Sequence, residues 1–292
     1  MLGPIRSLLF VPGTRQDRFD KAMRSGADAV ALDLEDGVEA SQKDRARALV
    51  ADYLSRPNPT AVLRLVRFNS LDTDLGAADV ACFRDVEGFD GLLLPKVETP
   101  GILETAARAL GARRVPLLAL LESPRAILRA AEIAAADAPV AALLFGAEDL
   151  TAQLGVARTI DGEELVVARG QVVLAAAAVG AEPIDAVFTN LDDLDALRRD
   201  CQRARRVGFR GKMAIHPKQV PVINEVLTPS SAEIDQARRV VAAFERAAAA
   251  GEGVVRMGDQ MVELPIVERA RRTLALAEAV GRAPSSAAPR AE

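Results

Sequence analysis

The chain has 292 residues, half of them hydrophobic, so it can bury a sizeable core as two ordinary domains or as one large α/β barrel. A net charge of −4, nine phenylalanines, one tyrosine and no tryptophan argue against a nucleic-acid groove with stacking platforms. No apolar run approaches the roughly 20 residues that cross a bilayer, and the N-terminus lacks a signal-peptide layout, so no membrane partner is expected. Cys82 and Cys201 are far apart, which predicts free thiols in a reducing cytoplasm.

Short apolar runs alternate with longer amphipathic stretches over residues 1–227. We expect strands at residues 7–11, 29–34, 61–67, 91–94, 116–121, 140–147, 184–189 and 212–215. We expect helices at residues 16–25, 41–54, 72–84, 101–110, 123–136, 163–179, 191–207 and 218–226. About eight strand–helix units predict a (β/α)8 TIM barrel. A doubly wound sheet is the alternative, but it usually has fewer strands and often a glycine-rich first turn, which this chain lacks.

The chain continues beyond the expected barrel. Residues 230–250 predict a helix, residues 254–263 a turn between two short extended pieces, and residues 265–280 a last helix. We therefore assign residues 1–227 to a catalytic barrel and residues 228–282 to C-terminal helices that form a lid or an oligomer contact. The Ala-, Pro- and Ser-rich residues 283–292 predict a disordered tail.

The expected fifth and sixth strands both end in carboxylates. The fifth ends at Glu122, and the sixth ends at Glu148 and Asp149, which spacing alone does not separate. Carboxyl ends of parallel strands lie side by side, so carboxylates on neighbouring strands predict a divalent-metal site. Oxygen ligands suit Mg²⁺ or Mn²⁺, and a chain with His216 as its one histidine has no histidine-cluster zinc site.

Other expected strand ends also carry charge. The second expected strand ends in Asp33, Glu35 and Asp36, and strand periodicity places Asp33 and Glu35 on one face. The third expected strand ends at Arg67, and the fourth ends at Lys96. Any one of these groups alone is more often a solvated loop start, but their convergence on the catalytic rim of a barrel predicts a site. A hard cation beside an arginine suits a substrate with a carboxylate next to an oxygen, as in carbon–carbon chemistry beside a 2-oxo acid.

Six segments together resemble the citrate lyase β-subunit-like family of the 2-oxo-acid aldolase superfamily, which includes malyl-CoA and citramalyl-CoA lyases. Each segment alone is weakly specific, whereas their order and spacing are specific. The resemblance covers about residues 5–281. The segments are RSLLFVPG at 6–13, LDLEDGV at 32–38, RFN at 67–69, LPK at 94–96, FGAED at 145–149 and GKMAIHP at 211–217.

The resemblance implies a Mg²⁺-dependent barrel that forms a homotrimer or hexamer. It implies cleavage of a 3-hydroxyacyl-CoA into a 2-oxo acid and acetyl-CoA, or the reverse. By position, Glu122 and Asp149 match the family's metal ligands, and Arg67 matches the arginine that clamps the oxo-acid carboxylate. Asp33, Glu35 and Asp36 match acidic positions around the polar pocket.

The remaining positions concern the two ends of the substrate. Arg67 and Asp36, with Gly146 and Ala147, are assigned to substrate binding. The resemblance also implies contacts with coenzyme A, made by Phe10, Arg15, Lys21, Ile215, His216 and Pro217.

The C-terminal extension departs from the family pattern at one position. CoA-lyase relatives carry an aspartate in a Met-Ile/Val-Asp-x-Pro segment, which reaches a neighbouring subunit's site and handles the proton on the acetyl carbon. This chain has MVELP at 261–265, so Glu263 stands there, with Asp259 as a second candidate. The extra methylene shifts the carboxylate, and about 1 Å of misplacement can cost roughly 100-fold in rate. Glu263 either works with a shifted lid or marks a changed substrate or reaction.

We therefore expect a Mg²⁺-dependent lyase for citramalyl-, malyl- or citryl-CoA, with Arg67, Asp33, Glu35 and Glu263 as catalytic residues. A malate or citramalate synthase or an acyl-CoA thioesterase would use the same site. A citrate lyase β subunit working on an acyl-carrier protein is a further alternative, against which the candidate coenzyme A contacts argue. The substituent on the carbinol carbon depends on side chains that only the fold places.

Overall fold

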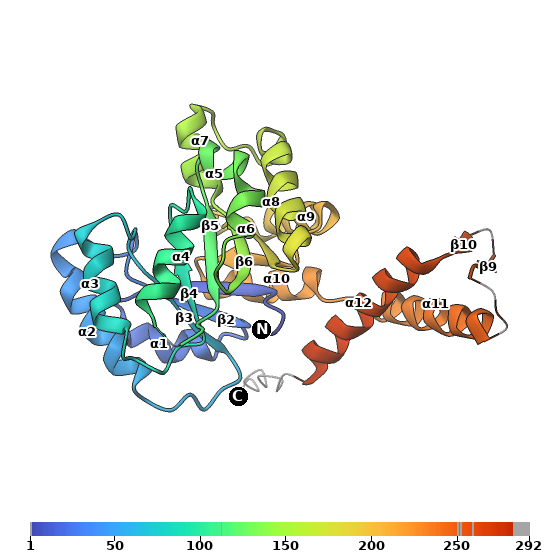
Figure 1. The fold of residues 1–292 in the computed structure, drawn as a ribbon, viewed down its shortest axis with the longest axis horizontal. Helices are drawn as coiled ribbons and strands as arrows, with labels where there is room; N and C mark the ends of the chain where they lie inside the picture. The colour runs from blue at the N-terminus through green and yellow to red at the C-terminus, as the bar shows by residue number, and fades with distance from the viewer. Residues whose placement is uncertain (1, 112, 250, 252, 259, 283–292) are drawn as a thin grey trace. The chain divides into compact units, whose positions relative to one another are not determined.

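The computed structural model describes residues 2–111, 113–249, 251, 253–258 and 260–282 (Figure 1). These residues form two compact units, of which the first runs to Leu227 and the second begins at Thr228. No helix in the described ranges is long and apolar enough to cross a membrane.

Eight parallel strands of the described chain close into a barrel, in which each pairs with the next and β1 pairs with β8. They are β1 Ser7–Pro12, β2 Ala29–Asp33, β3 Leu63–Arg67, β4 Gly91–Leu94, β5 Leu117–Leu121, β6 Val140–Phe145, β7 Glu182–Asp185 and β8 Gly211–Ala214. The closed ring confirms the predicted (β/α)8 barrel. It excludes the doubly wound sheet, because an open sheet leaves its edge strands unpaired.

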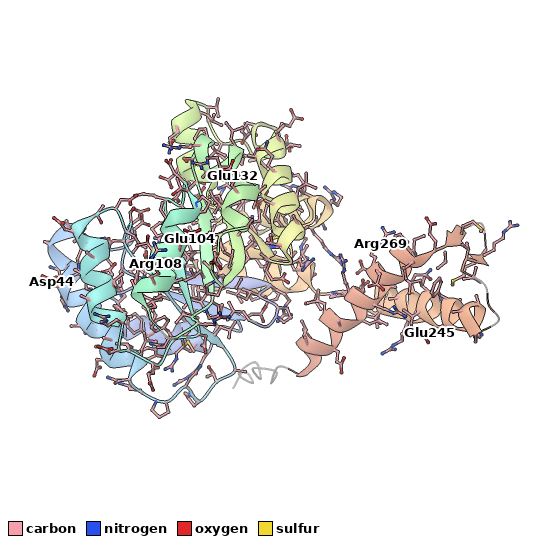
Figure 2. The ribbon with its side chains drawn as sticks, in the orientation of Figure 1. Asp44, Glu104, Arg108, Glu132, Glu245 and Arg269 are labelled. Carbon is pink, nitrogen blue, oxygen red and sulfur yellow. The ribbon has the colours of Figure 1, made fainter. Side chains whose placement is uncertain are left out.

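Helices form the outer layer of the barrel. They are α1 Gln16–Met23, α2 Lys43–Leu54, α3 Asp74–Phe83, α4 Pro100–Ala109, α5 Pro124–Leu128, α6 Ala130–Ala134, α7 Ala147–Leu154, α8 Val166–Val179, α9 Leu194–Val207 and α10 Val220–Leu227, with short 3₁₀ turns η1 Ala40–Gln42, η2 Glu163–Leu165 and η3 Pro217–Gln219. Their charged side chains line the outer surface, as Asp44 of α2, Arg108 of α4 and Glu132 of α6 show (Figure 2).

Three predicted boundaries were wrong. The expected helix at 123–136 is two short helices, since the backbone leaves helical geometry at Arg129. The seventh strand lies earlier than 184–189, because its ladder with β6 and β8 involves only residues 182–185. The sixth strand ends at Phe145 instead of residue 147, and α7, which was not predicted, follows it. Pairing partners, which the local pattern does not specify, decide where these strands stop.

Strand periodicity sorts the core into two layers. Inward-facing side chains such as Leu65, Leu120 and Met213 pack inside the barrel, whereas outward-facing ones such as Leu32 and Val66 pack against the helices. The same alternation continues past the apolar positions. It places the side chains that follow the inner core on β2, β3 and β5 at the barrel mouth, and these are Asp33, Arg67 and Glu122.

A buried ion cluster joins β7 and β8 to the helices outside them. Lys212 Nζ lies 2.7 Å from Asp185 Oδ2 and 2.6 Å from Asp200 Oδ2. Arg169 donates from Nε to Asp185 at 2.9 Å and from Nη2 to Asp200 at 3.0 Å. Burial alone would raise the pKa of Asp200, but Lys212 and Arg169 outweigh it and lower that pKa. The two buried cations thus share the same two carboxylates, and Arg203 at the edge of the cluster lies 3.5 Å from Asp200 Oδ1.

The second unit is a helical hairpin with a small β-hairpin. It contains α11 Ser231–Ala249, β9 Val255–Met257, β10 Gln260–Val262 and α12 Leu264–Arg282. The predicted start of α11 is confirmed, because Ser230 and Glu233 exchange hydrogen bonds as a capping box. Its own apolar core includes Val240 and Val267. The predicted tail at 283–292 and the candidate Asp259 lie outside the described residues.

Replacing Lys212 by methionine should destabilise the barrel, because the buried carboxylates of Asp185 and Asp200 both lose the ammonium group that contacts them. We expect Lys212→Met to lower the free energy of unfolding by about 3–5 kcal/mol, as measured by urea denaturation. The control is Arg198→Met, which breaks an exposed ion pair with Glu225 and should cost about 1 kcal/mol or less. Equal losses in the two variants would contradict a stabilising role for the buried cluster.

Candidate active site

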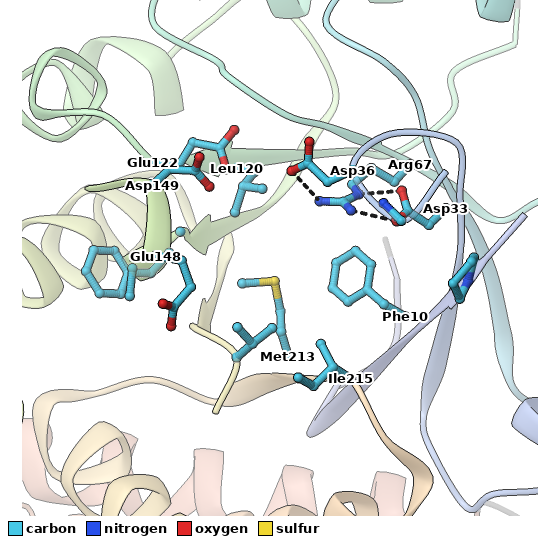
Figure 3. Close-up of a pocket in the computed structure, with 16 residues that line it drawn as sticks. Phe10, Asp33, Asp36, Arg67, Leu120, Glu122, Glu148, Asp149, Met213 and Ile215 are labelled. Carbon is cyan, nitrogen blue, oxygen red and sulfur yellow. Dashed lines mark hydrogen bonds and ion pairs between the residues drawn. The ribbon is translucent and has the colours of Figure 1, made fainter. Parts of the chain in front are cut away.

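The barrel mouth opens into a cavity of about 390 Å³ (Figure 3). It lies at the carboxyl ends of the strands, where barrels of this kind carry their active sites. The fold brings together most of the residues that the sequence singled out. Those that line the cavity are Phe10, Asp33, Asp36, Arg67, Glu122, Gly146, Ala147, Asp149 and Ile215.

Arg67 is held rigidly at one side of the cavity. It is in register with Asp33 on the neighbouring strand, and donates to it from Nε at 2.7 Å and from Nη2 at 2.6 Å. Its Nη1 lies 2.9 Å from Glu35 Oε2, and the Phe10 ring packs 4.8 Å from its Cζ. Burial alone would lower the pKa of Arg67, but Asp33 outweighs it and raises that pKa. The guanidinium therefore stays charged and keeps further N–H groups for a substrate anion.

The loop after β2 is fixed from both sides. Asp33 accepts hydrogen bonds from the N–H groups of Glu35 at 2.8 Å and Gly37 at 3.0 Å. From beneath, Lys43 Nζ donates at 2.7 Å to the carbonyls of Leu34 and Glu35 and to Asn69 Oδ1. The sequence did not reveal this role of Lys43, because a lysine at the start of an amphipathic helix has the appearance of a surface residue.

Lys96 connects the Arg67 side of the site to the acidic side. Its Nζ lies 3.0 Å from Glu35 Oε1, and its backbone N–H donates to Glu122 Oε1 at 2.7 Å. Its φ of 55° is the one positive value among the described non-glycine residues. Such a conformation costs about 1 kcal/mol or more and is found where a site requires it. Here it directs the N–H at Glu122.

Glu122 and Asp149 form an acidic pair on the other side of the cavity (Figure 3). Burial, together with the nearby carboxylates of Glu35 and Asp149, raises the pKa of Glu122 to about 8. A cation would relieve this excess of negative charge. No group of three or more His, Cys, Asp or Glu side chains in the described ranges is arranged to hold a metal. The pair nevertheless fits Mg²⁺, which typically binds one or two carboxylates and keeps its other positions for water and substrate.

The structure corrects the predicted setting of Asp149. It lies in the first turn of α7 instead of at a strand end, since β6 stops at Phe145 and the chain turns at Gly146. Acidic side chains are favourable in a first helical turn, where the helix dipole is positive. Glu148, the alternative that spacing left open, forms an ion pair with Arg158 and points away from Glu122 and Asp149 in Figure 3.

Gly146 permits the close approach between β5 and the turn before α7. A Cβ placed there would overlap the Cβ of Glu122 and lie 3.1 Å from its Oε2. Its own N–H donates to the Leu121 carbonyl at 2.9 Å. The glycine is therefore required by space beside Glu122.

Several predicted site residues do not line the cavity. Glu35 lies behind Arg67 and Lys96, almost fully buried. Arg15 and Lys21 are exposed at the start of α1 and along it. His216 caps η3, where its Nδ1 accepts from the Lys218 N–H at 3.1 Å, and Pro217 is the first residue of that turn. The roles of Arg15, Lys21, His216 and Pro217 toward coenzyme A stay predictions.

Glu263 belongs to the second unit. It precedes α12, where its carbonyl accepts hydrogen bonds from the N–H groups of Ile266 at 2.9 Å and Val267 at 3.2 Å. Its side chain is exposed. The backbone position is thus anchored while the carboxylate is accessible.

The fold and the site define a class of protein: a TIM barrel whose mouth places a pair of carboxylates and a buried arginine around one cavity. Residues 6–217 match the HpcH/HpaI aldolase/citrate lyase family, and the chain belongs to that family. The predicted resemblance is thereby confirmed.

Relatives cover nearly the whole chain. A (3S)-malyl-CoA thioesterase of Cereibacter sphaeroides is 38% identical over 277 residues, which is 95% of this chain and 96% of the relative. The crystal structure of the protein CitE from Mycobacterium tuberculosis in complex with magnesium, acetoacetate and coenzyme A is 35% identical, with a TM-score of 0.78 over 95% of this chain and 98% of that one. A citrate lyase β subunit from the same organism, complexed with oxaloacetate and magnesium, is 35% identical, with a TM-score of 0.68 over 77% of this chain and 98% of that one.

A methyl group at position 146 should displace Glu122 and weaken cation binding. We expect Gly146→Ala to reduce Mg²⁺ affinity by at least about tenfold, measured by calorimetric titration of the purified protein. The matched control is Gly170→Ala in α8, where an added Cβ meets nothing within 4 Å. Unchanged affinity in Gly146→Ala would show that Glu122 does not hold the cation.

Proposed function

We propose that this protein is a Mg²⁺-dependent carbon–carbon lyase. Its substrate is a 3-hydroxyacyl-CoA of the malyl-, citramalyl- or citryl-CoA type, which it cleaves into a 2-oxo acid and acetyl-CoA. The observation that carries the proposal is that Arg67 and the pair Glu122 and Asp149 line one cavity. A carboxylate and a neighbouring oxygen of one small substrate can then engage both. The relatives complexed with magnesium and oxo acids support the same chemistry.

The residues of this chain would divide the work as follows. Glu122 and Asp149 would hold Mg²⁺, which when bound polarises substrate oxygens as a Lewis acid. Arg67 binds the substrate carboxylate through its free N–H groups and sets the orientation of the scissile bond. Asp33 holds Arg67 by two hydrogen bonds, and Glu35 lies against its Nη1, so both act as positioning residues.

Cleavage removes a proton from the substrate hydroxyl and breaks the carbon–carbon bond, and a proton is then added to the carbon next to the thioester carbonyl, which becomes the methyl group of acetyl-CoA. Asp36 is the acceptor we propose for the first, because it lines the cavity, is largely exposed and lies 4.0 Å from Arg67. Figure 3 shows its carboxylate between Arg67 and the acidic pair. Glu263 is the proposed donor for the second, acting in the site of a neighbouring copy within a homotrimer or hexamer, as the family pattern implies.

Thioester hydrolysis is the second candidate, favoured by the 38% identity to a (3S)-malyl-CoA thioesterase. The two reactions differ in their products. Lyase activity on malyl-CoA yields glyoxylate and acetyl-CoA without consuming water, whereas hydrolysis yields malate and free coenzyme A. Mass spectrometry of the products with Mg²⁺ present therefore separates them, and free coenzyme A without acetyl-CoA would replace the lyase assignment.

Removing the proposed metal ligand Asp149 should nearly abolish turnover, whereas altering the adjacent carboxylate of Glu148 should not. We expect Asp149→Asn to lower kcat/KM by about 1,000-fold or more, since the cation site loses a charge that stabilises the transition state. Glu148→Gln is the matched control, with an expected loss below about fivefold, because that side chain pairs with Arg158. Comparable losses in both variants, measured by steady-state kinetics, would contradict the assignment of Asp149.

The role of Glu263 is tested by keeping or removing its carboxylic acid group. Glu263→Gln should lower the cleavage rate by about 100-fold or more, because an amide cannot protonate carbon. Glu263→Asp keeps a carboxylic acid that is one methylene shorter, so it should retain more activity than Glu263→Gln. Glu268→Gln, in an exposed ion pair with Arg271 on the same helix, is the control. Full activity of Glu263→Gln would move the proton donor elsewhere.

A further inference from the structure

The substituent on the carbinol carbon decides which 2-oxo acid is released. We propose, resting on the lyase function above, that the site takes substrates whose carbinol carbon bears one carboxylate and a hydrogen or small alkyl group, and that it rejects a carboxymethyl group there. The products would then be glyoxylate or pyruvate, and citryl-CoA, which releases oxaloacetate, would be a poor substrate.

The balance of charge in the cavity leads to this inference. Among the described residues that line it, Arg67 is the one cation. Five carboxylates line the same cavity: Asp33, Asp36, Glu122, Glu148 and Asp149. Arg67 and a divalent cation suffice for one substrate carboxylate and the neighbouring hydroxyl. A second substrate carboxylate would meet no further positive charge from this lining.

Two cations that contact residues of the site are already held by protein carboxylates. Lys96 Nζ lies 3.0 Å from Glu35, and Lys96 does not line the cavity. Arg158 is paired with Glu148, is largely buried and is likewise absent from the lining. Recruiting Arg158 to a ligand would take it from Glu148, and recruiting Lys96 would leave the buried Glu35 with Arg67 alone, which opposes the exchange.

The floor of the cavity is apolar. Leu120 and Met213 belong to the inner core of the barrel, and Phe10 and Val187 pack against that core. Figure 3 shows Leu120 between the acidic pair and Arg67, with Met213 near Phe10. A substrate held at one end by Arg67 and at the other by the cation site therefore presents its remaining substituent to hydrocarbon. A methyl group gains from this contact, whereas a carboxylate loses its hydration without a compensating partner.

Discrimination against citryl-CoA should be strong, because its second carboxylate would be placed in the site without a charged partner. One methylene more or less in an apolar pocket changes kcat/KM by about 10- to 200-fold, and an unpaired charge is penalised more heavily. The rival outcome is a citryl-CoA enzyme, given that a relative was crystallised with oxaloacetate.

The direct test compares three thioesters with the full-length protein and Mg²⁺. We expect malyl-CoA and citramalyl-CoA to be cleaved, and citryl-CoA to have a kcat/KM at least about 100-fold lower than the better of them. A citryl-CoA value within about tenfold of either would overturn the inference.

Binding of the product acids separates this inference from the lyase function. If none of the thioesters is cleaved, the lyase function is wrong, and calorimetric titration of glyoxylate, pyruvate and oxaloacetate with Mg²⁺ present decides the specificity alone. Binding of pyruvate or glyoxylate at least about tenfold tighter than oxaloacetate supports the inference. Equal or tighter binding of oxaloacetate, or binding of none of the three, overturns it.

A cation introduced into the floor should relax the discrimination. Val187 is half-buried in a loop after β7, so a longer side chain there can reach solvent. We expect Val187→Lys to raise the ratio of kcat/KM for citryl-CoA over citramalyl-CoA by about tenfold or more, and Val187→Leu to leave that ratio unchanged. An unchanged ratio in Val187→Lys would show that the missing cation is not the cause.

Discussion

The paired hydrogen bonds between Asp33 and Arg67 are the interaction on which the site depends. The two residues are in register on neighbouring strands, so barrel closure itself brings carboxylate and guanidinium together. The same carboxylate folds the loop after β2 by accepting from the N–H groups of Glu35 and Gly37. One side chain thus fixes the guanidinium of Arg67 and the acidic loop beside it. A bidentate pair is well suited to this, because its planar geometry specifies orientation as well as distance.

Two of the ionic clusters among the described residues have opposite physical roles. In the cluster around Lys212 and Arg169, both buried cations contact the buried carboxylates of Asp185 and Asp200. The cluster joins β7 and β8 to the helices, and both of its buried cations are held by protein carboxylates. The cavity at the barrel mouth is unbalanced, with one arginine facing an excess of carboxylates. Burial and like charge raise the pKa of Glu122 to about 8, which is a cost the apo protein bears and a bound cation removes.

Close packing at the mouth is as important as charge. Gly146 lets the turn before α7 approach β5, and without that contact Glu122 could not occupy its present place. Lys96 adopts a left-handed backbone so that its N–H meets Glu122. A glycine at position 146 and a left-handed backbone at Lys96 therefore both support the carboxylate of Glu122. This pattern is expected where function outweighs local propensity. Below them, the apolar inner core forms a floor that restricts what a substrate can present.

The sequence by itself determined the barrel, its strand order and most members of the site, because period-two alternation and the rule that catalytic groups follow parallel strands are local and general. It identified Arg67, Asp33 and Glu122 for that reason. Only the tertiary structure decided that α7 carries Asp149 and that Glu148 turns to Arg158, since a strand's end depends on its partners. It also decided the identity of the floor and the role of Lys43, because contacts between residues distant in sequence leave no trace in local pattern.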